Sequence, residues 1–159
     1  MKNAKVIIIR GIPGSGKSTF SNKLINEIKA KGEDAKDFEA DNFFMKDGKY
    51  KFNPSLLYFA HCWCFNHFKK YIETTGEKTR TAIVSNTFTT MKEVKKYLDY
   101  VHQNGIQCIV FRMNSQHQNI HDVPEEVLKI MTDRFQEIPN EIIVNDDSED
   151  LICKSIYKN

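Results

Sequence analysis

One eight-residue segment constrains the fold of this 159-residue chain more than any other: Gly11-Ile12-Pro13-Gly14-Ser15-Gly16-Lys17-Ser18. It matches the pattern G-x-x-x-x-G-K-[ST] in full, and this pattern forms a phosphate-binding loop when it joins a strand to a helix. A β-branched run precedes it at residues 5–9, and apolar residues follow with helical spacing over 17–31. The sequence therefore predicts a strand, a phosphate-binding loop (P-loop) and a helix, in that order.

The residue types of the predicted P-loop suit a nucleotide bound with a magnesium ion. Glycines let the backbone wrap closely around a phosphate, and backbone N–H groups with the N-terminus of the next helix supply partial positive charge. Lys17 adds a full charge, Ser18 offers a hydroxyl ligand to Mg²⁺, and Thr19 is placed to assist at the α-phosphate. A dinucleotide-binding fingerprint is excluded, because residues 14–19 lack its third glycine and carry a lysine instead. We expect ATP and Mg²⁺ as cofactors, and these residues at the nucleotide: Gly11, Pro13, Gly14, Ser15, Gly16, Lys17, Ser18 and Thr19.

Strands and helices are predicted to alternate along the rest of the chain. Further strands are expected at residues 35–40, 81–85, 106–113 and 141–144, and helices at 54–75, 90–105 and 124–138. A loop or short hairpin is expected at 46–52, and a short element of either type at 150–157. This order predicts an α/β, three-layer P-loop kinase fold with a central parallel sheet of about five strands flanked by helices. We expect one domain over residues 1–159.

Composition and charge limit the partners, the location and the metal sites that we expect. Its net charge is +2, so nucleic acid is a permitted partner but not one that the charge demands. The apolar run at residues 6–9 is too short for a signal sequence or a membrane span, so we expect a cytoplasmic protein without a membrane partner. His61, Cys62, Cys64 and His67 do not share one helix face, so we expect no structural metal.

Among P-loop proteins, the remaining sequence favours a small kinase. The chain is short for the additional modules of a ring ATPase, and it has no Asn-Lys-x-Asp segment for reading guanine. Asp41 follows the second predicted strand, at the carboxyl edge where ligands of open α/β sheets bind. A carboxylate there would accept the proton of an acceptor hydroxyl during phosphoryl transfer. A helix cap or a loop carboxylate is the alternative for Asp41.

Several segments, taken in order, resemble the P-loop kinase domain of phage polynucleotide 5′-kinase and its small phage, bacterial and eukaryotic relatives. The resemblance runs from Lys5 to about Glu137, through R-G-I-P-G-S-G-K-S-T, E-A-D-N-F-F, the 48–52 segment leading to A-H-C-W, S-N-T-F-T-T and N-I-H-D-V-P. The order and spacing of these segments carry it, more than any one of them. It implies a kinase that moves the γ-phosphate of ATP to a 5′-hydroxyl end of DNA or RNA, with Asp41 as the general base.

The resemblance also implies which residues surround the acceptor. Asn86 and Thr87, at the end of the third predicted strand, match polar positions that contact the acceptor end or its base, and a strand-end turn is the alternative. His61 and Trp63 are implied near the acceptor pocket, where an aromatic ring can stack on a base, whereas core packing is an equal alternative for Trp63. The expected acceptor-binding residues are therefore Asp41, His61, Trp63, Asn86 and Thr87.

The segment that closes over the phosphates departs from the family pattern. Relatives usually carry an arginine just before Asn-x-His-x-Val-Pro, and Gln118 stands there in this chain. A neutral amide cannot stabilise the charge of phosphoryl transfer as a guanidinium does. Arg134 or Arg112 is expected to substitute. The predicted catalytic residues are therefore Asp41, Lys17 and Arg134, with Arg112 at the nucleotide.

Three interpretations of the function follow from the sequence. The first is a kinase for a 5′-hydroxyl nucleic-acid end, whose backbone could run along Lys46, Lys49 and Lys51, although solvated surface lysines are the commoner explanation. The second is a kinase for a small hydroxyl acceptor, such as a nucleoside, a nucleotide or a metabolite. The third is a nucleotide-binding regulatory protein with little transfer activity, in keeping with Gln118. Residues 142–147 end in carboxylates, and we expect them near the adenine and not at a metal.

Overall fold

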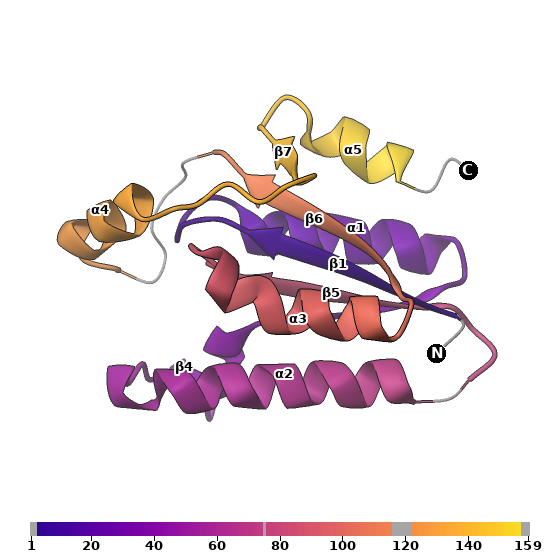
Figure 1. The fold of residues 1–159 in the computed structure, drawn as a ribbon, viewed down its shortest axis with the longest axis horizontal. Coiled ribbons are helices and arrows are strands. Elements are labelled where there is room, and N and C mark those ends of the chain that lie inside the picture. Colours follow the sequence, from indigo (N-terminus) through magenta and orange to yellow (C-terminus); the bar gives the residue numbers. More distant parts are fainter. Residues whose placement is uncertain (1–2, 75, 116–121, 157–159) are drawn as a thin grey trace.

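The computed structural model describes residues 3–74, 76–115 and 122–156. Its central sheet has five parallel strands in the order β2-β5-β1-β6-β7. Their bounds are Ala4–Arg10 for β1, Asp34–Phe38 for β2, Arg80–Asn86 for β5, Gln107–Met113 for β6 and Ile142–Val144 for β7. Helices lie on both faces of this sheet (Figure 1), and the predicted α/β fold is confirmed.

The helices of the described ranges are α1 (Lys17–Ala30), α2 (Leu57–Glu73), α3 (Met91–Gln103), α4 (Glu125–Asp133) and α5 (Glu149–Ser155). All of them except α4 make the outer layers, two on each face of the sheet. Buried side chains of α2 and α3 share one apolar cluster with the sheet, and those of α1 and α5 share a second cluster on its other face. None of the helices in the described ranges is long and apolar enough to cross a membrane.

Strand β1 shows why the sheet needs both layers. Val6 and Ile8 belong to the cluster beneath α2 and α3, whereas Ile7 and Ile9 belong to the cluster beneath α1 and α5. All four side chains are at most 2% exposed. Successive side chains of a strand point to opposite faces, so a continuous apolar run is stable only when both faces are covered.

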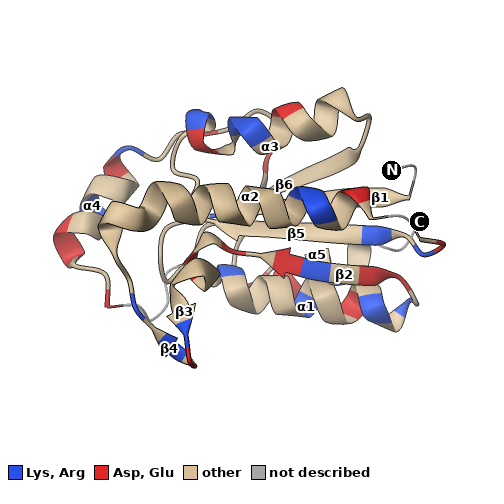
Figure 2. Cartoon of the chain, turned by 90° about the horizontal axis from the view of Figure 1, so that it is seen from below, with Lys and Arg blue, Asp and Glu red and all other residues tan. Residues whose placement is uncertain are grey.

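Short elements fill the connection between β2 and α2. A 3-10 helix, η1 (Ala40–Phe44), follows β2 closely and carries Asp41. Strands β3 (Met45–Lys46) and β4 (Lys49–Tyr50) then pair as an antiparallel hairpin, and a second 3-10 turn, η2 (Pro54–Leu56), leads into α2. Figure 2 shows the hairpin at the same end of the molecule as α4, which is the end where the strands of the main sheet have their carboxyl termini.

The helix expected over residues 124–138 is shorter than predicted, because α4 ends at Asp133. The Gln136 N–H donates to the Thr89 carbonyl at 2.8 Å, and the Gln136 carbonyl accepts from Arg10 at 2.7 Å. The backbone groups of this residue are therefore used by distant parts of the chain and not by a continuing helix. No buried residue lies on α4 itself, which stands apart from the main body in Figure 1.

Arg10, the last residue of β1, is fully buried and joins three parts of the chain. Its Nη1 donates to Glu141 Oε2 at 2.7 Å, and its Nε and Nη2 donate to the Phe88 carbonyl at 3.0 and 2.7 Å. Its Nη2 also reaches the Gln136 carbonyl, and the guanidinium lies 4.2 Å from the ring centre of Phe135. The end of β1 is thereby tied to the loop after β5 and to the segment before β7.

Replacing Glu141 with alanine should lower the free energy of unfolding by about 3 kcal/mol, because it leaves the buried Arg10 guanidinium without its counter-charge. The matched control is Glu137→Ala, since the Glu137 side chain is 90% exposed and lies 3.9 Å from Arg112. Its effect should stay below about 0.5 kcal/mol. Urea denaturation measures both, and equal effects would show that the Arg10–Glu141 pair does not hold the fold.

Candidate active site

The P-loop runs from the end of β1 to the start of α1 along a tight path. Gly14 and Gly16 have φ angles of 81° and 89°, a backbone conformation that favours glycine. A Cβ added at Gly11 would lie 2.4 Å from Ser15 Oγ and 3.1 Å from the Met113 Cβ, so this position has no room for a side chain. The glycines of the motif are therefore required by the conformation of the loop.

The N-terminus of α1 opens onto this loop. Its first turn carries no acidic residue, and no side chain caps it. Ser18 and Thr19 are exposed on that turn. The first N–H groups of a helix have no partner within the helix, and the helix dipole adds partial positive charge there, so this end of α1 suits a phosphate.

Lys17 lies where a phosphate on the loop would meet its charge. Its Nζ donates to the Gly11 carbonyl at 2.9 Å and to the Ile12 carbonyl at 3.1 Å. Burial lowers the pKa of Lys17 to about 8, and the negative charges of Glu39 and Asp41 oppose this shift. The charges of both carboxylates are therefore close enough, at this edge of the sheet, to act on the amine of Lys17.

Glu39 is a site residue that the sequence analysis missed. It follows the end of β2, and its Oε1 accepts a hydrogen bond from Ser18 Oγ at 3.0 Å. Burial raises the pKa of Glu39, whereas the bond from Ser18 and the charge of Lys17 lower it. Oxygen ligands of this kind suit Mg²⁺. The signal in the sequence was the Glu39-x-Asp41 spacing at the end of a predicted strand.

Asp41 is held from both sides of its 3-10 helix. The Tyr50 hydroxyl donates to Asp41 Oδ1 at 3.2 Å. On the other side, the Ala40 N–H donates to Asn86 Oδ1 at 2.8 Å, while the Asn86 amide N–H reaches Cys64 Sγ at 3.8 Å. Asn86 is 7% exposed and anchors the segment that carries Asp41. Its expected contact with an acceptor stays a prediction.

The loop after β5 lies directly against the P-loop. The Gly11 N–H donates to the Thr87 carbonyl at 3.2 Å. Strand β5 also lies between β1 and β2 in the sheet, so its end separates the P-loop from the segment of Asp41. The structure thus places Thr87 and Asn86 between the predicted nucleotide side and the predicted acceptor side.

His61 and Trp63 lie on α2 close to η1. Trp63 packs on Phe43 of η1, with ring centres 6.0 Å apart, and on His67, with ring centres 4.4 Å apart. Burial and the charge of Lys96 lower the pKa of His61, and the charge of Asp41 opposes them. Both side chains are partly buried, and their contact with an acceptor stays a prediction. Over the described ranges, no group of three or more His, Cys, Asp or Glu side chains could hold a metal ion.

The arginines expected near the phosphates have protein partners. Arg112 Nη1 lies 3.4 Å from Glu141 Oε1, beside the Arg10 cluster. Arg134 Nε donates to Thr89 Oγ1 at 2.9 Å, and its Nη2 lies 3.7 Å from Glu93. The Arg134 side chain is 48% exposed, more than twice the 22% of Arg112. Gln118, at the expected lid position, lies outside the described residues.

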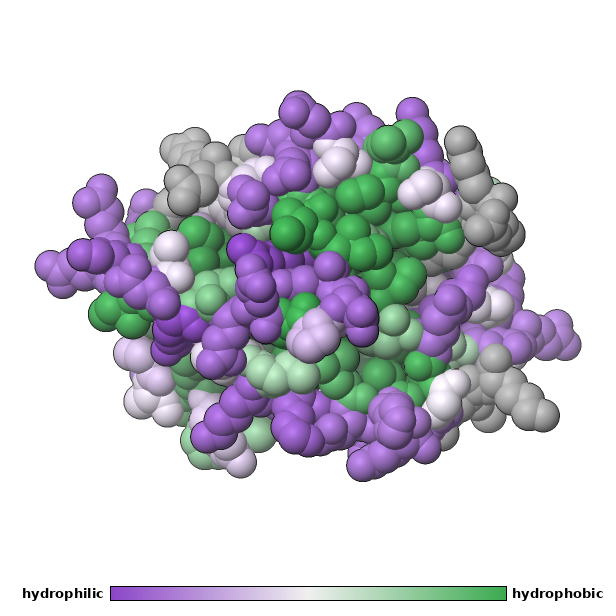
Figure 3. Space-filling model, turned by 45° about the horizontal axis from the view of Figure 1, so that its top comes forward, coloured by the Kyte–Doolittle hydropathy of each residue, from purple (hydrophilic) through white to green (hydrophobic). Residues whose placement is uncertain are grey.

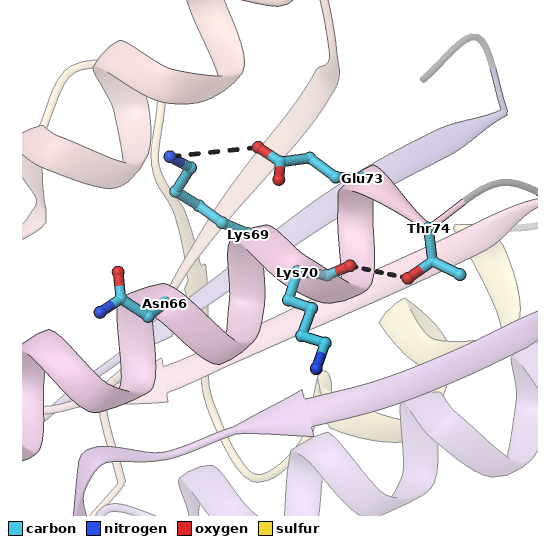
Figure 4. Close-up of a pocket in the computed structure, with 5 residues that line it drawn as sticks. All are labelled: Asn66, Lys69, Lys70, Glu73 and Thr74. Carbon is cyan, nitrogen blue, oxygen red and sulfur yellow. Dashed lines mark hydrogen bonds and ion pairs between the residues drawn. The ribbon is translucent and has the colours of Figure 1, made fainter.

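Two surface depressions lie away from this edge. One, of about 390 Å³, follows the last turns of α2 and is shown in Figure 4. Its lining residues are Asn66, Lys69, Lys70, Glu73 and Thr74. The side-chain interaction within it is a 4.0 Å ion pair between Lys69 and Glu73, which is an ordinary contact along one helix surface. The other, of about 410 Å³, lies at the amino ends of β1 and β6. Neither depression brings together side chains that suggest a catalytic site.

Apolar side chains are exposed on the face that carries β7 and α5 (Figure 3). Ile142 and Ile143 on β7 are 45% and 48% exposed, and Leu151 on α5 is 70% exposed. The strand expected at residues 141–144 is present as β7, which lies at one edge of the sheet beside β6. The adenine expected near residues 142–147 would meet apolar surface here, and this placement stays a prediction.

The fold and the loop together define a protein with a P-loop kinase fold, and comparison with known proteins gives its family. The model of a family described as "AAA domain" matches residues 6–138, well over half of the chain. The chain belongs to this family.

The matches to two curated relatives cover very different shares of those proteins. NEDD4-binding protein 2 of Homo sapiens is 28% identical over 141 residues, which are 82% of this chain and 8% of the human protein. The chain therefore spans a small part of that relative. An uncharacterized protein of Pasteurella multocida is 26% identical over 162 residues, covering 96% of this chain and 90% of its own length.

Solved structures share the fold at low sequence identity. The APS kinase of Mycobacterium tuberculosis, in complex with AMPPNP and APS, matches with a TM-score of 0.69 at 14% identity, over 97% of this chain and 95% of its own. Kti12 of Chaetomium thermophilum, in complex with ADP-AlF3, matches with a TM-score of 0.68 at 10% identity, over 96% of this chain and 97% of its own. Both likenesses concern the fold.

Nucleotide binding should take up protons above about pH 8. The pKa of Lys17 is about 8, and a polyphosphate beside its Nζ favours the charged form, so binding raises this pKa. Between the two pKa values the bound lysine holds a proton that the free lysine has lost, so affinity for ATP falls as the pH rises through this range. Calorimetric titration at about pH 9, in buffers of different ionisation enthalpy, measures the proton count.

Lys17→Arg is the control, because a guanidinium stays charged throughout this range. Its nucleotide binding should take up no proton. Equal proton uptake by the variant would assign the proton to another group.

Proposed function

We propose that this chain is an ATP-dependent phosphotransferase that moves the γ-phosphate to an acceptor hydroxyl. The observation that carries the proposal is the grouping of Lys17, the Ser18–Glu39 pair and Asp41 at the carboxyl edge of the sheet. Phosphoryl transfer depends on positioning and charge stabilisation more than on covalent chemistry, and these groups supply both.

In the proposed reaction, Asp41 accepts the proton of the acceptor hydroxyl while the hydroxyl oxygen bonds to the γ-phosphorus. The bond from the γ-phosphorus to the bridging oxygen breaks, and ADP leaves with that electron pair. Lys17 and the N–H groups at the start of α1 stabilise the charge on the phosphate oxygens. Arg134 is the arginine proposed to assist them.

Ser18 and Glu39 are the residues proposed to hold Mg²⁺. A hydroxyl and a carboxylate 3.0 Å apart, next to the loop, offer the oxygen ligands that this ion prefers. Bound there, Mg²⁺ would neutralise charge on the phosphates.

The acceptor that we propose is a 5′-hydroxyl end of DNA or RNA. The order of motifs that resembles the polynucleotide 5′-kinase domain supports this choice. So do two aromatic side chains: Phe43, which lies on the same 3-10 helix as Asp41, and Trp63, which packs on Phe43. A small hydroxyl acceptor is the second candidate, favoured by the fold shared with an APS kinase whose structure holds APS. The cytoplasmic location also stays a prediction.

Asp41→Asn should abolish transfer, lowering kcat by about a hundredfold or more, because an amide cannot accept the proton. The measurement is transfer of labelled γ-phosphate from ATP to a panel of 5′-hydroxyl oligonucleotides, nucleosides and nucleotides. Asp99→Asn, at an exposed position of α3, is the control and should behave as wild type. Labelling confined to small acceptors would replace the nucleic-acid proposal with the second candidate. No labelling at all would contradict both.

Glu39→Gln should raise the Mg²⁺ concentration needed for half-maximal transfer by about tenfold, because a neutral amide is a weaker ligand than a carboxylate. The same shift should appear in the Mg²⁺ dependence of nucleotide affinity, measured by calorimetry. Glu73→Gln, on the exposed face of α2, is the control. An unchanged Mg²⁺ dependence in Glu39→Gln would remove this residue from the proposed metal site.

A further inference from the structure

We propose that the hairpin of residues 45–52, called here the basic hairpin, binds the phosphodiester chain of a single-stranded acceptor and positions Asp41 through Tyr50. This inference rests on the proposed function and names the part of the acceptor that lies beyond its reacting hydroxyl. The basic hairpin follows η1 without a gap and projects at the carboxyl end of the sheet (Figure 2).

The basic hairpin is fastened to the helix that carries Asp41. The Lys51 N–H donates to the Phe44 carbonyl at 2.9 Å, which closes the chain back onto the end of η1. Phe44 is 2% exposed, and its ring centre lies 6.2 Å from that of Tyr50 and 5.1 Å from that of Phe52. A displacement of the basic hairpin would therefore also displace η1, because the two pack through these aromatic rings.

Positive charge is concentrated on this short segment. It holds Lys46, Lys49, Lys51 and one acid, Asp47, a net charge of +2 that equals the net charge of the whole chain. All three lysines are exposed, and none of them forms an ion pair with a described residue. The segment therefore presents a surface with a net positive charge.

The pairing of the two strands adds a second observation. Lys46 and Lys49 are directly opposite each other in the hairpin. Like charges at opposed positions destabilise a strand pair, so this arrangement is locally unfavourable. A bound polyanion relieves the repulsion, because it places negative charge beside both lysines. The register thus favours an anionic occupant over a solvated surface.

The ligand of the basic hairpin must also fit its exposed aromatic surface. Phe52 is 51% exposed, and its ring lies nearly parallel to that of Tyr50, with 13° between planes and 6.3 Å between centres. Nucleobases stack on such rings with little dependence on sequence, while the phosphates between them meet lysines. A single strand satisfies both features, whereas a small anion would use only the charge.

Tyr50 links the basic hairpin to the proposed base. Its hydroxyl donates to Asp41 Oδ1, and burial together with the charge of Asp41 raises the pKa of Tyr50 to about 12, so the hydroxyl keeps its proton. Tyr50 is a positioning residue, because its contact is with Asp41. Binding of the strand on one side of this tyrosine and proton transfer at Asp41 on the other are thereby coupled.

The test removes the three lysines together, as Lys46→Ala, Lys49→Ala and Lys51→Ala in one variant. A control variant removes three exposed lysines elsewhere: Lys29, Lys78 and Lys154. Binding of a fluorescent 5′-hydroxyl oligonucleotide is measured over a range of salt concentrations. The slope of log affinity against log salt should fall by about 2 in the hairpin variant, since each lost phosphate contact contributes about 0.7 on a single strand. The control should keep the wild-type slope.

Kinetics separate binding from positioning. The hairpin variant should raise KM for the oligonucleotide by about tenfold while leaving KM for a nucleoside 3′-phosphate and for ATP unchanged. Tyr50→Phe keeps the ring and loses the hydroxyl, so it should lower kcat for both acceptors by about fivefold without changing either KM. A rise in KM without a fall in kcat would overturn the positioning role of Tyr50.

Two negative results are distinguishable. If wild type labels oligonucleotides and the hairpin variant keeps the KM and salt slope of the control, the basic hairpin is not the binding surface and the proposed function stands. If wild type labels no oligonucleotide, the nucleic-acid acceptor itself is wrong and the inference falls with it.

Discussion

The buried guanidinium of Arg10 determines how the carboxyl edge of the sheet is arranged. A buried charge costs several kcal/mol unless it is paired and hydrogen-bonded, and Arg10 meets this cost through Glu141 and the carbonyls of Phe88 and Gln136. These partners come from two segments, the loop after β5 and the segment before β7. Because Arg10 directly precedes the P-loop, these segments are placed relative to the P-loop and not only to one another. The hydrogen bonds and the ion pair of the Arg10 guanidinium thus determine the local geometry of the site.

The segment that carries Asp41 is also fixed by a small number of hydrogen bonds. Asn86, at the end of β5, accepts the Ala40 N–H, and the loop that follows Asn86 is held by Arg10. The two sides of the site therefore share the end of one strand. A change at that strand end would move the proposed base and the P-loop relative to each other, and effective phosphoryl transfer tolerates little such movement.

Local patterns account for what the sequence could predict. The P-loop and the alternation of strands and helices each depend on residues a few positions apart. The remainder depends on contacts between distant residues. Glu141 lies 131 positions from Arg10, and Glu39 is 21 positions from its partner Ser18. The early end of α4 has the same origin, since partners of Gln136 from other segments replace the helical hydrogen bonds.

Three arginines near this edge differ in how readily they can exchange partners. Arg10 is fully buried, and removing it from Glu141 would leave a buried guanidinium without its counter-charge, so its role is structural. Arg112 binds the same carboxylate and is mostly covered. Arg134 pairs with Glu93 at 3.7 Å, where both side chains are more than a third exposed. Exposed pairs contribute about 0–1 kcal/mol, so separating Arg134 from Glu93 costs little beyond its hydrogen bond to Thr89. Of these three arginines, Arg134 is therefore the one whose partners leave it most available for the role proposed for it.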